Sequence, residues 1–172
     1  MKSMKVNKRK YSINKVNCTS TLILASTLVV AVLSCHLPSI FAFMVLIVCW
    51  FSMLYFSHCL AHYLIGSILG IKFKYYTLSR SMLSKKFHFL ENINIFLTLR
   101  LDEKPKGWKG FAMFVAGPVS SMLTPLTIVV ISWTCHPFIS KILLLLTVFN
   151  ALFTGYFSSK YGCVYKGLKC LK

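Results

Sequence analysis

Residues 57–71 read SHCLAHYLIGSILGI, an apolar run that carries two histidines, His58 and His62. If this run is helical, the four-residue spacing puts both imidazoles on one face, one turn apart. A helix presents two nitrogen ligands to a single metal ion with this spacing. The alternative is that the histidines simply pack in a buried helix. Ionisable groups are costly inside a membrane, so at membrane depth a functional role is favoured.

The composition indicates an integral membrane protein. The 172 residues are 56% hydrophobic, and only three are acidic against twenty Lys and Arg, which gives a formal net charge of +17. Long apolar runs are typical of membrane-spanning chains. The basic residues flank these runs, and the chain has neither an aromatic–basic RNA signature nor a glycine-rich phosphate loop. We therefore expect the lipid bilayer as a partner and no nucleic acid.

The apolar runs predict an all-α polytopic membrane protein with four transmembrane helices. A basic cytoplasmic N-terminus, residues 1–17, precedes a single membrane domain, residues 18–172, with predicted spans at 18–37, 39–71, 110–134 and 137–159. The second span would be about 50 Å long, against a hydrocarbon core of ~30 Å. It must therefore tilt, kink or protrude from the bilayer.

Residues 72–109 form the one sizeable polar segment between the spans. The segment is rich in aromatic and β-branched residues that alternate weakly, which predicts a short β-like or re-entrant cytoplasmic segment at the membrane surface. A surface loop with interfacial aromatic residues is the alternative. His88 and Glu91 lie three positions apart here, in a setting where such residues are more often solvated than catalytic.

The distribution of basic residues predicts the orientation in the membrane. Six lie in residues 1–17, nine in 72–109 and four in the basic tail 160–172, whereas Lys141 alone lies between the third and fourth spans. Cytoplasmic segments carry the excess of Lys and Arg. We therefore expect a multi-pass protein of the cell membrane with both termini in the cytoplasm.

Two motifs resemble those of the site-2 protease family, the intramembrane zinc metalloproteases. HCLAHYLIGSILGI is similar to the family's HE-x-x-H helix, so that its zinc-binding histidines fall on His58 and His62 and its catalytic Glu falls on Cys59. Residues 116–121, AGPVSS, resemble the family's AGPxxN-type motif, whose Asn falls on Ser121. The resemblance implies a zinc cofactor and a hairpin within residues 72–109 that helps to present substrate.

The resemblance also implies a third zinc ligand. In the family this ligand is an Asp late in the last core helix, and the matching stretch here begins at Asn150 and ends in GCVYKGLK, which places the Asp on Cys163. A thiolate is at least as good a zinc ligand as a carboxylate. His58, His62 and Cys163 would then form a three-ligand site with an open fourth position.

The general base of the family is missing. There a Glu takes a proton from zinc-bound water and passes it to the leaving amine, and a general base contributes ~10²–10⁴-fold in rate. A thiol at Cys59 does not replace it, and the chain's only carboxylates, Glu91, Asp102 and Glu103, lie outside every predicted span. The resemblance thus implies a pseudoprotease that keeps zinc and binds transmembrane segments of other membrane proteins without cutting them.

Three other interpretations stay open on the sequence. The chain could be an active intramembrane zinc protease with an unorthodox base, or a non-enzymatic structural or assembly membrane protein whose histidines only pack. Cys59 and His62, three positions apart, could also meet as nucleophile and base. Nothing in the sequence supplies the orienting acid or oxyanion hole that such a pair needs.

Two cysteines occupy matching positions at the outer ends of the first and third spans. The sequences Ser34-Cys35-His36 and Thr134-Cys135-His136 suggest the hypothesis of a disulfide between Cys35 and Cys135 in an oxidising exterior. The alternative is two unrelated boundary cysteines. A Cys2His2 metal site is less favoured, because adjacent Cys and His make a poor chelate.

Overall fold

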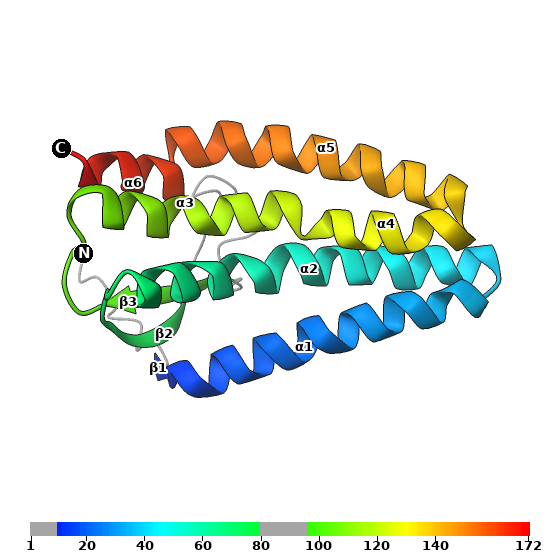
Figure 1. The fold of residues 1–172 in the computed structure, drawn as a ribbon, viewed down its shortest axis with the longest axis horizontal. Helices are drawn as coiled ribbons and strands as arrows, with labels where there is room; N and C mark the ends of the chain where they lie inside the picture. Colours follow the sequence, from blue (N-terminus) through cyan, green and yellow to red (C-terminus); the bar gives the residue numbers. More distant parts are fainter. Residues whose placement is uncertain (1–9, 80–95) are drawn as a thin grey trace, which may run out of the picture.

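Four long helices dominate the fold. The computed structural model describes residues 10–79 and 96–172, and in this part of the chain four helical stretches are long and apolar enough to cross a membrane. They lie side by side in an elongated bundle (Figure 1) and comprise Ile13–His36, Ser39–Ile68, Gly107–Cys135 and Pro137–Lys160. The predicted all-α polytopic membrane architecture is confirmed.

The described helices are six α-helices and one short 3-10 turn. In chain order they are α1 (Ile13–Leu33), the 3-10 turn η1 (Ser34–His36), α2 (Ser39–Ile68), α3 (Gly107–Leu123), α4 (Pro125–Cys135), α5 (Pro137–Lys160) and α6 (Cys163–Cys170). Two boundaries differ from the prediction at the ends of the chain. The first helix begins at Ile13 and not at residue 18, and the basic tail 160–172 contains the helix α6.

The second span ends three residues earlier than the predicted 39–71, because a glycine stops it. Gly70 has a φ of 78°, the left-handed conformation that commonly terminates helices. The Ile71 N–H donates back to the Gly66 carbonyl at 2.8 Å, and the Gly70 N–H donates to the Ser67 carbonyl at 3.0 Å. These bonds satisfy carbonyls at the helix end and turn the chain towards the strands.

The third predicted span, 110–134, consists of two helices. α3 ends at Leu123 and α4 begins at Pro125, with Thr124 between them. The proline has no N–H to continue the helical ladder, so the backbone hydrogen-bonding pattern is interrupted there. Thr124 ties the break to α2, because its Oγ1 donates to the Met53 carbonyl at 3.2 Å and lies 2.8 Å from Ser57 Oγ.

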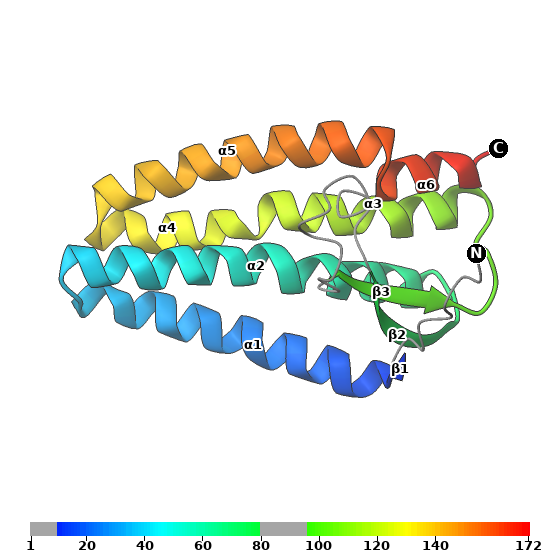
Figure 2. The same ribbon diagram turned by 180° about the vertical axis from the view of Figure 1, so that it is seen from behind.

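A small antiparallel sheet lies beside the C-terminal end of α2. Its strands β1 (Lys10–Tyr11), β2 (Phe73–Ser79) and β3 (Phe96–Leu101) are ordered β1-β2-β3, and Thr77 pairs with both Lys10 and Thr98. Figure 2 shows β2 and β3 beside the C-terminal part of α2. The β-like segment predicted within residues 72–109 is thus present, whereas His88 and Glu91 lie outside the described residues.

One tyrosine fastens this sheet to the first helix. The Tyr76 side chain is fully buried, and its hydroxyl donates to Asn17 Oδ1 of α1 at 2.9 Å. Burial raises the pKa of Tyr76, so the phenol stays protonated and keeps donating. On the exposed side of the sheet Lys74 pairs with Asp102 at 2.5 Å.

The apolar core lies in the half of the bundle far from the sheet. It is formed by side chains of all four spans, namely Ala31, Ala42, Leu46, Cys49, Trp50, Met53, Ile128, Val129, Ile139 and Leu143. The one indole N–H in this core, on Trp50, donates to Thr147 Oγ1 of α5 at 2.8 Å. A buried indole usually needs such a partner, and here the bond joins α2 to α5.

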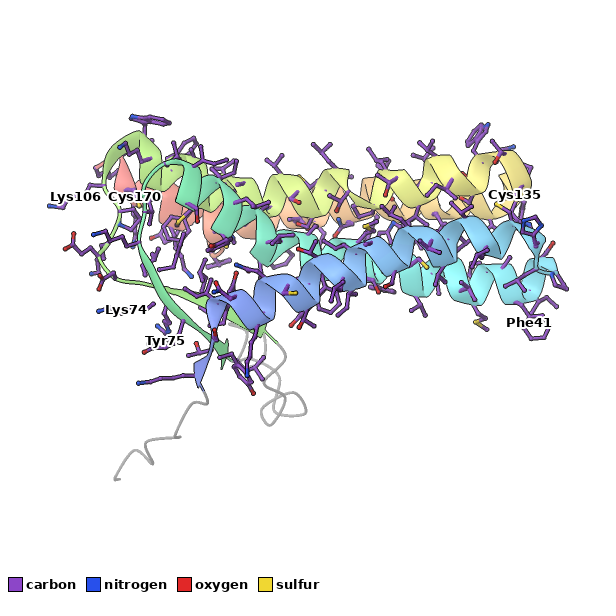
Figure 3. All side chains as sticks on the ribbon, turned by 60° about the horizontal axis from the view of Figure 1, so that its bottom comes forward. Phe41, Lys74, Tyr75, Lys106, Cys135 and Cys170 are labelled. Carbon is purple, nitrogen blue, oxygen red and sulfur yellow. A yellow bond between two sulfur atoms is a disulfide. The ribbon has the colours of Figure 1, made fainter. Side chains whose placement is uncertain are left out.

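A disulfide closes the end of the bundle opposite the sheet. Cys35 and Cys135 are bonded, with their Cα atoms 5.3 Å apart. Figure 3 shows Cys135 at the same end as Phe41, whereas Lys74, Lys106 and Cys170 lie at the other end. The hypothesis that these two cysteines pair is therefore confirmed, and in this bonded state neither sulfur is a thiolate that could bind a metal.

Removing the disulfide should destabilise the protein. We expect Cys35→Ser, Cys135→Ser and the double variant each to lower the free energy of unfolding by about 2–4 kcal/mol, because each variant removes the same disulfide. Thermal unfolding in detergent measures this, and a non-reducing tryptic digest should contain the linked peptide. Cys18→Ser, at an exposed free cysteine, is the matched control. Additive losses in the double variant would contradict a shared bond.

Candidate metal centre

Three predicted ligands meet in the part of the bundle near the sheet. His58 and His62 project from α2, and Cys163 is the first residue of α6. Their ligand atoms all lie within 4.8 Å of one another. The two Nε2 atoms are 3.2 Å apart, and Cys163 Sγ lies 3.8 Å from His58 Nε2. The structure thus brings together side chains separated by 105 positions in the sequence.

Two of the three separations between these atoms suit a zinc ion, and the third, between His62 and Cys163, is at most 4.8 Å. With Zn–N bonds of about 2.0–2.1 Å and a Zn–S bond of about 2.3 Å, tetrahedral geometry separates two nitrogens by about 3.3 Å and a nitrogen from a sulfur by about 3.6 Å. The observed separations of 3.2 Å and 3.8 Å are close to these values. Two imidazoles and one thiol also form a donor set that zinc prefers, with a fourth position open.

The orientation of His62 leaves its Nε2 free to bind a metal. Its Nδ1 lies 2.7 Å from the Met113 carbonyl of α3, and because a carbonyl only accepts, Nδ1 must donate. The unprotonated Nε2 then faces the cluster. The ring is 9% exposed, so little water reaches it. Metal-binding histidines almost always donate their other ring N–H in this way.

Ser121 gives His58 the same orientation. The Ser121 hydroxyl donates to the Pro118 carbonyl at 3.0 Å, so its oxygen is left to accept from His58 Nδ1, 3.3 Å away. Both imidazoles then point an unprotonated Nε2 at the other across 3.2 Å. Two facing lone pairs repel each other unless a proton or a metal ion lies between them. A proton or a metal ion shared by the two nitrogens would remove this repulsion.

Asn150 supports this arrangement from α5. Pro125 has no N–H, so the Ser121 carbonyl lacks the helical donor that residue 125 would otherwise supply. The Asn150 side chain donates to that carbonyl at 3.0 Å, and its own oxygen accepts from Thr154 Oγ1 at 3.2 Å. The sequence marked Asn150 only as the start of a motif. Its function as a partner for Ser121 depends on a proline in another helix.

Gly117 allows α3 to approach the metal ligands closely. A Cβ atom at this position would lie 2.6 Å from Cε1 of His62, a separation that real Cβ atoms do not show. The glycine of the AGPVSS stretch is therefore needed because the His62 ring occupies the space beside it. The Met113 carbonyl that accepts from His62 lies one helical turn before Gly117, so both contacts depend on the same close packing.

A tight turn after α5 brings Cys163 to the site. Ser158 Oγ accepts from the Val164 N–H at 3.2 Å, which satisfies a free donor at the start of α6. Gly162 fits closely over Ser158, because a Cβ there would lie 2.7 Å from Ser158 Cα. Burial raises the pKa of the Cys163 thiol, and the nearby Lys166 ammonium acts in the opposite direction. A metal that binds this sulfur displaces its proton.

Cys59, at the position of the family's catalytic Glu, does not belong to the cluster. Its thiol donates to the Leu97 carbonyl of β3 at 3.3 Å. The predicted alternative of a Cys59–His62 nucleophile pair has no support in these contacts, because the ring nitrogens of His62 face Met113 and His58. Among the described residues the cluster also contains no carboxylate. Asp102 is instead paired with Lys74.

The cluster lies close to one face of the membrane. At 1.5 Å per residue, His58 is about 29 Å along α2 from the start of the helix at Ser39, near the far limit of a ~30 Å hydrocarbon core. His62 is about 9 Å from the C-terminal end of α2 at Ile68, because Gly70 ends the helix there. The candidate ligands are thus close to the end of α2 that adjoins the sheet.

The fold and the cluster define a membrane protein with four spanning helices and a two-histidine, one-cysteine site near one face. No protein-family model, curated protein or solved structure matches this chain.

Filling the space at Gly117 should weaken metal binding. We expect Gly117→Ala to reduce zinc affinity by about 10- to 100-fold, because the added methyl group displaces the His62 ring from its bond to Met113. Competition with a chromogenic chelator measures the affinity. Gly155→Ala is the control in another spanning helix, where the new Cβ would lie 3.7 Å from Met122 Cε. Equal affinities of the two variants would contradict the close packing around His62.

Proposed function

We propose that this chain is a site-2-protease-like pseudoprotease of the cell membrane that binds zinc through His58, His62 and Cys163. The observation that carries the proposal is the meeting of their three ligand atoms within 4.8 Å. The order of the motifs also agrees, since the paired histidines, the AGPVSS helix and the late cysteine come from α2, α3 and α6. The zinc ion supplies a Lewis acid with one open position.

The same site lacks the group that would make it an efficient peptidase. Hydrolysis needs a base beside the metal-bound water, and a thiol that donates to a backbone carbonyl, as Cys59 does, is no substitute. The described carboxylates, Asp102 and Glu103, lie in the loop after β3 and not in the cluster. The proposed role is therefore the binding of transmembrane segments of other proteins without cleavage.

The sheet supports a role in segment binding. β3 is the last strand in the order β1-β2-β3, and its Leu97 carbonyl contacts the residue that follows the ligand His58. An extended segment held near β3 would therefore lie next to the metal ligands. This position matches the substrate-presenting hairpin that the family resemblance implies, and it uses the main-chain pairing by which sheets bind peptides.

We further propose that the sheet end faces the cytoplasm. The sheet and α6 lie at one end of the bundle (Figure 1), and every described Lys and Arg except Lys141 belongs to that end. Positive charge favours the cytoplasmic side. The Cys35–Cys135 disulfide is at the opposite end, where an oxidising exterior would preserve it.

The metal content of the purified chain tests the proposal. We expect about one zinc per chain in detergent, lost in His62→Ala and in Cys163→Ser, because a site with two ligands binds zinc much more weakly. Inductively coupled plasma mass spectrometry gives the stoichiometry. Cys170→Ser, at the other end of α6, and Cys59→Ser are matched controls that should keep the metal. A metal-free chain with unchanged stability in His62→Ala would instead identify a structural protein whose histidines only pack.

Restoring the carboxylate tests the missing base. We expect Cys59→Glu to gain cleavage of a quenched fluorescent Leu–Ala transmembrane peptide, by about 10²–10⁴-fold over the unsubstituted chain, since that is the usual contribution of a general base. Adding His58→Ala should abolish the gain. Zinc-dependent cleavage by the unsubstituted chain at the rate of Cys59→Glu would contradict the proposal and indicate an active protease with another base.

A further inference from the structure

The short helix α6 has three distinct faces. Cys163, Gly167 and Cys170 recur with spacings of four and three residues and therefore share one face. Gly167 is buried, and a Cβ there would lie 3.2 Å from Phe114 Cβ and 3.3 Å from Phe111 Cδ2 of α3. Cys170 packs on Gly110 at the start of α3. This small-residue face fixes α6 against α3 and leaves its other two faces outward.

One outward face of α6 is apolar. Val164, Leu168 and Leu171 follow the same four-and-three spacing, displaced by one residue, so they form a stripe beside the contact with α3. Leu168 is 44% exposed and Leu171 is 52% exposed. Exposed leucines on one side of a short helix need an apolar environment, and in a membrane protein acyl chains supply it.

The other outward face of α6 is basic. Lys166 and Lys169, three residues apart, lie on the side opposite the apolar stripe. Both are exposed, and the Lys169 ammonium sits 4.5 Å from the ring centre of Tyr165. This contact keeps the ammonium beside the helix. No carboxylate is among the hydrogen-bond or ion-pair partners of these lysines in the described part of the chain.

The depth of α6 in the membrane follows from the helix that it packs on. Gly110 lies about 38 Å along the α3–α4 span from the outer end at Cys135, beyond a hydrocarbon core of ~30 Å and within the headgroup layer. Trp108, two residues earlier, is 62% exposed, as expected for an aromatic residue at the membrane interface. Figure 1 shows α6 beside this first part of α3. The basic and apolar faces are therefore at headgroup level.

We propose that α6 forms a binding site for an anionic phospholipid of the inner leaflet. Lys166 and Lys169 bind the phosphate on one side of α6, and an acyl chain that crosses the exposed Tyr165 ring reaches Leu168 on the other side. Helices with one basic and one apolar face at this depth bind in this manner. The charge of this end would also suit an acidic protein segment, but such a segment would leave the exposed leucines without a partner. The choice of the inner leaflet rests on the proposed orientation, whereas the site itself does not depend on zinc.

Native mass spectrometry of the full chain in detergent tests the site. We expect palmitoyl-oleoyl-phosphatidylglycerol to bind more tightly than the matching phosphatidylcholine. Lys166→Gln/Lys169→Gln should weaken the binding of the first phosphatidylglycerol molecule by about 10- to 30-fold, because each lysine near anionic headgroups usually contributes about 1 kcal/mol. Glutamine forms helices as readily as lysine, so α6 should persist, and circular dichroism checks this. Leu168→Gln should also weaken binding, although it removes no charge.

A matched double variant separates a site from diffuse attraction. Lys72→Gln/Lys104→Gln removes two exposed charges from the same end of the bundle but leaves α6 unchanged. We expect this variant to change the affinity for phosphatidylglycerol by less than about threefold, because exposed charges away from α6 act on the lipid only through solvent, where salt screens them. Glycerophosphoglycerol, which has no acyl chains, should not compete at equal concentration. Equal losses in the two double variants, competition by the free headgroup, or no preference over phosphatidylcholine would each overturn the proposal.

Discussion

The hydrogen bond from His62 to the Met113 carbonyl is the contact on which the site depends. At 2.7 Å it joins α2 to α3 and fixes which ring nitrogen carries the proton. It forms only because Gly117 lets α3 approach the imidazole. With Nδ1 committed to the backbone, Nε2 is turned to His58 and Cys163, and its lone pair becomes available to a cation. The packing of two helices thus determines the chemistry of one nitrogen.

The rest of the bundle follows from the cost of unpaired polar groups at membrane depth. Among the described residues, no buried side-chain nitrogen or oxygen lacks a hydrogen-bond partner. The backbone is served in the same way at the break before Pro125, where Asn150 donates to the Ser121 carbonyl that the proline leaves without a helical donor. Trp50 and Thr147 satisfy each other in the apolar core in the same way. Each of these bonds joins two helices, so the polar groups also define how the spans pack.

The proposed pseudoprotease and the proposed lipid site use different faces of the same small helix. Cys163 lies on the face of α6 that packs against α3, whereas Lys166 and Lys169 project from the side. An anionic lipid held on that side would stabilise the position of α6, and Cys163 is its first residue. Lipid binding and metal binding would then favour each other, because both require α6 to lie on α3.

The sequence by itself determined the features that depend on local spacing and composition. The periodicities and charges within each stretch predicted four apolar runs, two histidines one turn apart, a β-rich segment and a basic end. The structure contains the four apolar helices, the two histidines on one helix face and the strands. Only the tertiary structure decided which distant residues meet. Cys163 reaches His58 because of the turn at Gly162, Cys35 bonds to Cys135 because two spans end side by side, and Cys59 faces β3. Such contacts depend on how helices pack and turn, which no local pattern encodes.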